Sequence, residues 1–186
     1  MHIILASASK RRSDLMNIMG LDFSVEVSEC DENVEIVDPV ELVKTLALKK
    51  ACAVKEKHGI GFAIVGADTV VTLDGEIIGK PKDKPDAFKI LKRLSGKTHT
   101  VYTGIALLTD DKEFLEYDSS EVTFSQLTDD EIISYIETGE PMDKAGAYGL
   151  QGRFSVFVTK IVGSYFTIVG LPVHTLYAML KKAKSL

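Results

Sequence analysis

The chain has 186 residues, of which 45% are hydrophobic and 26% are charged, and its formal net charge is −5. This composition is typical of one globular domain over residues 1–186, and the acidic balance excludes a protein that coats nucleic acid through a basic surface. No stretch reaches the length of a membrane span and no leader pattern opens the chain. We therefore expect a cytoplasmic protein whose partners include no membrane and no nucleic acid polymer.

Strand and helix patterns alternate along the first part of the chain. Residues 2–6 predict a buried strand, and the helical spacing that follows it ends at Gly20. The segment FSVEV then alternates in the manner of a strand. The segment DPVE at 38–41 predicts the start of a helix that runs to about His58. It offers an N-cap aspartate, a proline at the first helical position and a glutamate that completes a capping box.

The middle of the chain predicts a strand at 62–73, interrupted by the residues GAD at 66–68. A tight hairpin turn is predicted at 74–75, between two apolar runs. The segment PDAFKILKRLSG then has the spacing of an amphipathic helix that stops at Gly96.

The last part of the chain continues this mixture of hairpins and helices. It predicts long strands at 98–108 and 114–126, a short helix starting at the capping box 128–131, two strands around Gly163-Ser164, and a final helix after Pro172. Because hairpins are mixed with helical crossovers, the whole pattern predicts an α/β protein with a mixed sheet.

The first chemical signal follows the first strand, where SASKRRSDLM places three cations in the first turn of a helix. The positive end of the helix dipole disfavours cations there, unless an anion binds the free N–H groups of the helix N-terminus. Lys10, Arg11 and Arg12 therefore indicate either an ordinary charged surface or an anion site, and this stretch alone leaves both open.

Other charged residues stand beside glycine or proline near the ends of apolar strands. Asp68 follows IVGA, and Lys80 precedes a proline that keeps the backbone extended. Glu32 closes SECDE, a crowded acidic loop of the kind that can hold a hard divalent cation. Each has an ordinary alternative: a turn carboxylate, a solvated loop lysine and a solvated acidic loop.

Two further positions carry similar alternatives. Lys50 lies within the capped helix beside its apolar face, so it either reaches past the edge of the core or is an ordinary exposed lysine. Gln151 lies in KAGAYGLQG, where the glycines allow either a close approach of the backbone to a ligand or simply tight turns.

Taken together, these motifs resemble one known family. LASASKRR, DE at 31–32, LALKKA, GADTVV, GKP, LSGKTHTVYTG and DKAGAYGLQG stand in the order seen in the Maf (septum-formation) family, and the resemblance covers essentially the whole chain. It implies a nucleoside triphosphate pyrophosphatase and a homodimer. The implied fold is that of inosine-triphosphate pyrophosphatases: a long mixed sheet with flanking helices, in two lobes around a cleft that holds the nucleotide. One departure is Lys10, where many relatives have proline.

The family's site residues carry over motif by motif. Those that match its phosphate contacts are Ser7, Arg11, Arg12, Lys50 and Lys80. Glu32 and Asp68 resemble the acidic pair that holds a divalent cation, Mg²⁺ or Mn²⁺, and Asp68 resembles the family's proposed proton acceptor. A carboxylate bound to a cation is a poor base, so whether Asp68 acts as a base or as a metal ligand alone stays open.

The resemblance extends to the subfamily that acts on dTTP and UTP, which has Arg, Thr and Gln where this chain has Arg11, Thr69 and Gln151. The branch that acts on 7-methyl-GTP has Trp, Gln and Glu there. Uracil and thymine present an N–H flanked by carbonyls, which an amide matches with one acceptor and one donor. We therefore expect hydrolysis of dTTP and UTP, and of modified pyrimidine nucleotides as an open possibility, to monophosphate and pyrophosphate.

The implied biological roles are cleansing of the nucleotide pool and arrest of cell division. The alternative function is a nucleotide-binding regulator of septation that binds without turnover. The presence of both Glu32 and Asp68 favours turnover.

Overall fold

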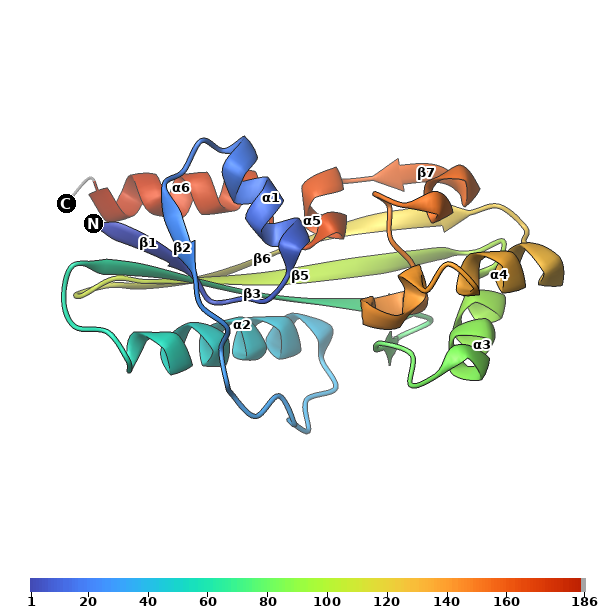
Figure 1. Cartoon of the computed structure of the whole chain (residues 1–186), viewed down its shortest axis with the longest axis horizontal. Coiled ribbons are helices and arrows are strands. Elements are labelled where there is room, and N and C mark those ends of the chain that lie inside the picture. The colour runs from blue at the N-terminus through green and yellow to red at the C-terminus, as the bar shows by residue number, and fades with distance from the viewer. Residues whose placement is uncertain (185–186) are drawn as a thin grey trace. The chain divides into compact units, whose positions relative to one another are not determined.

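A computed structural model describes residues 1–184, in which strands and helices alternate (Figure 1). The strands are β1 (His2–Leu5), β2 (Phe23–Val25), β3 (Phe62–Leu73), β4 (Glu76–Ile78), β5 (Thr98–Leu108), β6 (Glu113–Phe124) and β7 (Val158–Val162). The α-helices are α1 (Lys10–Ile18), α2 (Pro39–Lys55), α3 (Lys84–Leu94), α4 (Asp129–Ile136), α5 (Tyr165–Val169) and α6 (Val173–Lys184). Short 3₁₀ helices are η1 (Glu140–Asp143), η2 (Ala145–Ala147) and η3 (Arg153–Phe157). Within residues 1–184, no helix combines the length and the apolar composition needed to cross a membrane.

The chain divides into two units, each with its own internal packing. Unit 1 comprises Met1–Thr69, Thr103–Asp118 and Gly170–Leu186, and unit 2 comprises Val70–Tyr102 and Ser119–Val169. Hydrogen bonds order the strands β2-β1-β3-β5-β6-β7, with β4 paired to β3. Strand β1 is parallel to β2 and β3, whereas β4 is antiparallel to β3 and β7 is antiparallel to β6. The predicted mixed sheet with flanking helices is confirmed, and the single domain over 1–186 stays a prediction.

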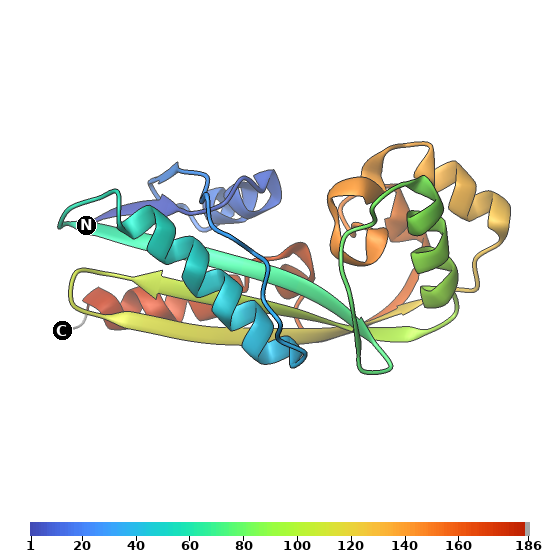
Figure 2. The same cartoon turned by 90° about the horizontal axis from the view of Figure 1, so that it is seen from below.

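In unit 1, helix α2 covers one face of the strands, and α1 and α6 cover the other (Figures 1 and 2). Glycines make room for α2. A Cβ on Gly66 of β3 would lie 2.1 Å from the carbonyl oxygen of Ala47, and a Cβ on Gly104 of β5 would lie 2.3 Å from that of Val43. The predicted interruption at 66–68 is therefore wrong: β3 runs through these residues, and Gly66 serves the contact with the helix instead of a turn.

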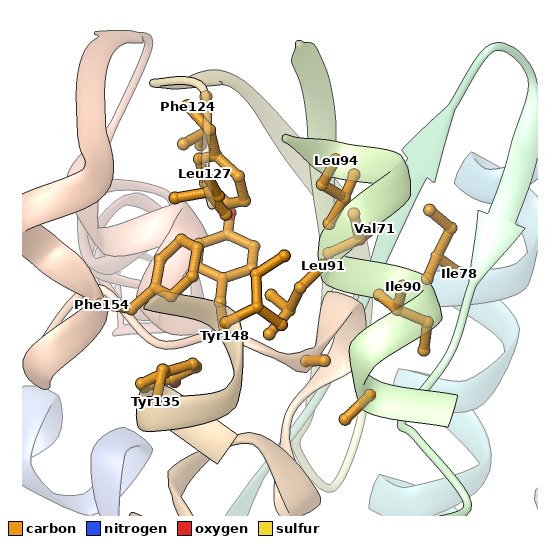
Figure 3. Packing of buried hydrophobic residues seen from close by; sticks show 14 of the residues in the cluster. Val71, Ile78, Ile90, Leu91, Leu94, Phe124, Leu127, Tyr135, Tyr148 and Phe154 are labelled. Carbon is orange, nitrogen blue, oxygen red and sulfur yellow. The ribbon is translucent and has the colours of Figure 1, made fainter. Parts of the chain in front are cut away.

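Unit 2 is packed around a cluster of aromatic side chains (Figure 3). Phe124, Tyr148 and Phe154 are each at most 5% exposed, and their rings meet at centroid distances of 4.7 to 5.4 Å. His99 joins this cluster at 2% exposure, with its Nε2 2.8 Å from the hydroxyl of Tyr148. Burial lowers the pKa of His99 to about 4, because the apolar surroundings disfavour the imidazolium form.

Most local signals for turns and helix ends are confirmed. The turn at 74–75 has φ values of 52° and 82°, as a tight hairpin between β3 and β4 requires. Asp38 caps α2 by accepting a hydrogen bond from the backbone N–H of Glu41 at 2.9 Å. The capping box at 128–131 is complete and begins α4. Helix α2 itself ends at Lys55, one turn before the residue expected.

The prediction of a second strand after Gly163 is wrong, because the chain turns at this residue and then forms helix α5. Gly163 has φ of 118°, and a Cβ on it would lie 2.5 Å from Ser120 Oγ. The Ser120 hydroxyl accepts from the backbone N–H of Ser164 at 2.8 Å and donates to the Ser164 carbonyl at 3.1 Å. Both backbone groups of Ser164 are thus engaged by a side chain, which removes them from the ladder that a further strand would need.

Candidate active site

Asp68 and Lys50 form a buried ion pair in unit 1. Gly66 and Asp68 are two residues apart on β3 and so share the face that α2 covers. Lys50 Nζ lies 2.6 Å from Asp68 Oδ1, and both residues are 8% exposed. At this depth the desolvation of each charge is costly and is offset by its partner, so each side chain holds the other in place.

Lys50 also contacts a second carboxylate. Its Nζ is 3.2 Å from Oε1 of Glu32, which lies in the irregular segment 26–38. The side chain of Glu32 is 54% exposed, so water screens this contact and it contributes far less than the contact with Asp68. The two acidic residues singled out in the sequence thus converge on one cationic group.

The guanidinium of Arg12 is held on several sides. Its Nε donates to the carbonyl oxygen of Gly170 at 2.8 Å, its Nη1 to Ser7 Oγ at 3.1 Å and its Nη2 to Thr69 Oγ1 at 3.2 Å. Ser7 Oγ also accepts from the backbone N–H of Ser9 at 3.2 Å, so its position is fixed as well. Arg12 is therefore oriented by the protein before any ligand binds.

Charges of both signs lie near this guanidinium. Burial lowers the pKa of Arg12 most, Asp68 raises it, Arg11 lowers it and Glu32 raises it. The group stays charged at neutral pH, because the ordinary pKa of arginine lies far above 7. With Lys50, the site holds three cations against two carboxylates. The formal surplus of positive charge suits an anionic ligand.

The hydroxyl of Thr69 has a second hydrogen-bond partner that the sequence does not reveal. Thr69 Oγ1 lies 2.9 Å from Oγ1 of Thr103 on β5, and Thr103 is fully buried. A threonine inside an apolar strand gives no local sign of such a contact. The one sequence feature that draws attention to Thr103 is its place in YTG, at the end of the family motif LSGKTHTVYTG. The carbonyl of Gly170 has no sequence signal at all.

Helix α1 begins in the manner that the sequence suggests. Its first residue is Lys10 and its N-cap is Ser9, whose side chain makes no capping hydrogen bond in the described structure. The first turn carries Lys10, Arg11 and Arg12 and no acidic residue. Uncapped backbone N–H groups and adjacent cations favour an anion at this end of the helix.

The structure groups the predicted site residues by unit. Hydrogen bonds join Ser7, Arg12 and Thr69, and ion pairs join Glu32, Lys50 and Asp68, all in unit 1. Arg11 precedes Arg12 in the same helix. Lys80 and Gln151 belong to unit 2, and both are exposed.

The glycines on either side of Gln151 make close contacts within unit 2. A Cβ on Gly149 would lie 2.7 Å from Cε of Lys144, and a Cβ on Gly152 would lie 2.0 Å from Oε2 of Glu140. Glycine at both positions therefore lets the loop pack against its own side chains.

Glu32 and Asp68 fit the role of ligands for a hard divalent cation. Their donors are carboxylate oxygens, which Mg²⁺ and Mn²⁺ prefer, and both already face one cation, the ammonium of Lys50. In the described part of the chain, no group of three or more His, Cys, Asp or Glu side chains is arranged to hold a metal. Two carboxylates with substrate phosphates as further ligands are a usual Mg²⁺ arrangement, so the residues present fit this group.

The sequence as a whole matches a known family. A family model described as Maf-like protein matches residues 2–183. A dTTP/UTP pyrophosphatase of Bacillus cytotoxicus is 48% identical over 183 residues, which cover 98% of this chain and 95% of that protein. A dTTP/UTP pyrophosphatase of Symbiobacterium thermophilum is 48% identical over 179 residues, which cover 96% of this chain and 92% of that protein.

Two solved structures share the fold. The Ham1 protein of Staphylococcus aureus superposes with a TM-score of 0.58 at 12% identity, and the match covers 99% of this chain and 100% of that one. A HAM1 protein from Coxiella burnetii gives a TM-score of 0.57 at 15% identity, with 98% and 99% covered. At such low identity the likeness concerns the fold alone.

Proposed function

Because the chain belongs to the Maf-like protein family, we propose that it is a nucleoside triphosphate pyrophosphatase that converts dTTP and UTP to the monophosphate and pyrophosphate. Curated relatives with this activity in their names are 46% to 48% identical over nearly the whole chain. The structural observation that supports the proposal most is the buried Lys50–Asp68 pair in unit 1, together with the anchored guanidinium of Arg12. Preorganised cations beside a carboxylate suit a substrate that carries several negative charges.

In the proposed reaction, water attacks the α-phosphorus and the bond from that phosphorus to the α–β bridging oxygen breaks. Pyrophosphate leaves with the electron pair of that bond. Arg11, Arg12 and Lys50 stabilise the charge on the leaving group, and Arg12 does so without reorientation because the protein already holds it. Asp68 is the proposed acceptor of the proton from the attacking water, and a role as metal ligand alone is the alternative.

We also propose a divalent cation, Mg²⁺ or Mn²⁺, as cofactor, with Glu32 and Asp68 as its protein ligands. When bound, such an ion supplies further positive charge to the phosphate oxygens. Two variants separate the roles of the two carboxylates. Asp68→Asn should lower kcat by about 10²-fold or more, the lower range for a positioned acid–base group. Glu32→Gln should instead raise the Mg²⁺ concentration needed for half-maximal rate.

The choice of base is assigned to Gln151, with Thr69 and Arg11 as the other positions that distinguish the subfamily. An amide can meet the N–H and a flanking carbonyl of uracil or thymine with one acceptor and one donor. Lys80, also in unit 2, is proposed as a further phosphate contact. We propose a homodimer in the cytoplasm, where the enzyme removes pyrimidine nucleotides from the pool.

The test is a product assay with dTTP and UTP in the presence of Mg²⁺ or Mn²⁺. We expect monophosphate and pyrophosphate in equal amounts, and no reaction when a chelator is added. Stepwise release of orthophosphate through a diphosphate would overturn the proposal, because it would place the attack at the γ-phosphorus. Stoichiometric binding without turnover would favour the regulator of septation.

A further inference from the structure

We propose that Thr103 is a positioning residue for the phosphate site, which acts through Thr69 on the guanidinium of Arg12. This inference rests on the proposed function for its consequence in catalysis. The contacts themselves are seen in unit 1. Arg12 Nη2 lies 3.2 Å from Thr69 Oγ1, which in turn lies 2.9 Å from Thr103 Oγ1.

The N–H groups of Arg12 that point to the protein determine where its remaining N–H groups point. A guanidinium carries five N–H groups and has no acceptor. Three of these groups, one on each nitrogen, donate to Gly170, Ser7 and Thr69. Each Nη retains one further N–H, and these two are the groups that can reach phosphate oxygens. Their direction is set by the three acceptors, so a change in any acceptor rotates the pair that meets the ligand.

The hydroxyl of Thr69 connects Arg12 to Thr103. Because Arg12 can only donate, Thr69 Oγ1 must accept from it. The hydrogen bond between Thr69 and Thr103 can run in either direction, yet both directions place Oγ1 of Thr69 at the same point. Thr103 is 0% exposed, so water does not replace its hydroxyl readily. Gly170 bounds the same space, since a Cβ there would lie 3.2 Å from Thr69 Oγ1.

This role differs from reading of the base, which the proposed function assigns to Gln151. Both hydrogen bonds of Thr69 go to groups of the protein, one of them the phosphate-binding Arg12. Removal of the Thr103 hydroxyl should therefore weaken the enzyme for every nucleoside triphosphate by the same factor. A residue that acted on the base would instead change the ratio between substrates.

The experiment compares Thr103→Val with Thr103→Ser and with a matched control, Thr72→Val. Valine has the shape of threonine without the hydroxyl, and serine restores the hydroxyl. Thr72 lies on β3, is 8% exposed, and its hydroxyl makes a long bond of 3.5 Å to the carbonyl of Thr100. For each protein, kcat and KM are measured with dTTP, UTP and GTP, together with the melting temperature.

We expect Thr103→Val to lower kcat/KM about tenfold for all three substrates, because a hydrogen bond to a group that holds a charge is lost. Thr103→Ser should recover most of this loss, and Thr72→Val should stay within about twofold of wild type. The proposal is overturned if Thr103→Val matches Thr72→Val, if serine gives no recovery, or if the loss differs among the bases. If Thr103→Val does not fold, Thr103→Ala with Thr72→Ala as its control carries the same expectations.

A binding measurement keeps this proposal separate from the proposed function. The affinity of α,β-imido-UTP, which cannot be cleaved between its α- and β-phosphorus, is measured by calorimetry for wild type and for the same variants. Weaker binding by Thr103→Val and recovery by Thr103→Ser would support the positioning role even if wild type showed no turnover. Equal affinity in all variants would overturn it even if the enzyme were active.

Discussion

Replacement of Lys50 by methionine tests the buried ion pair at the centre of the site. The change keeps an unbranched side chain and leaves the carboxylate of Asp68 without its ammonium partner. Removal of one member of a buried pair costs about 3–5 kcal/mol. Asp68 is 8% exposed and the Glu32 side chain is 54% exposed, so nearly all of this cost falls on Asp68. We expect the free energy of unfolding to fall by about 3 kcal/mol.

The assay is urea denaturation in the presence of a chelator, with Asp68→Asn, Glu32→Gln and the double variant Lys50→Met/Asp68→Asn beside the single one. The double variant should recover most of the loss, because the orphaned charge is gone. Glu32→Gln should cost less than about 1 kcal/mol, because its contact is exposed. The reasoning is refuted if Lys50→Met stays within about 0.5 kcal/mol of wild type, or if the double variant is less stable than Lys50→Met.

Further predictions concern pH, packing and base choice. Since burial lowers the pKa of His99 to about 4 from 6.5, the unfolded chain binds the proton first as pH falls. Stability should be highest above about pH 6.5 and drop by up to roughly 3 kcal/mol towards pH 4, and His99→Gln should lack this slope in urea titrations. Gly66→Ala should cost at least about 2 kcal/mol, because its Cβ meets a helix carbonyl, whereas Gly59→Ala, which meets nothing within 4 Å, should cost little in the same assay. Gln151→Glu should lower kcat/KM for dTTP and UTP by about ten- to a hundredfold and for GTP by less; an equal loss on all three would contradict a role in reading the base.

The elements that depend on neighbouring residues can be predicted from the sequence. Asp38 accepts from Glu41, three residues away, and the turn at 74–75 depends on the φ angles of those residues themselves. Such interactions form within one helical turn or one hairpin, so the local pattern contains them. The same holds for the capping box at 128–131.

Features that depend on distant segments cannot be predicted in this way. The pattern around Gly66 indicates a break in the strand, because a glycine has the same local signature whether it serves a turn or a helix that packs on it. The turn at Gly163 depends on Ser120, more than forty residues earlier. The acceptor that Gly170 offers to Arg12 is 158 residues away along the chain.

The candidate site shows the same division. The residues alone leave an ordinary alternative for each of Asp68, Lys50 and Glu32, and the order of the family motifs is what connects these three residues. The structure adds that Asp68 and Lys50 are buried together, whereas Glu32 is exposed. It also adds Thr103, since a hydroxyl inside an apolar strand reveals its partner only when the strands are paired.

Hydrolysis of UTP in ¹⁸O-labelled water, with Mg²⁺ and mass spectrometry of both products, tests the central claim most directly. If water attacks the α-phosphorus, the label appears in the uridine monophosphate and the pyrophosphate stays unlabelled. Label in the pyrophosphate would place the attack at the β-phosphorus. That result, or labelled orthophosphate with uridine diphosphate, would contradict the account.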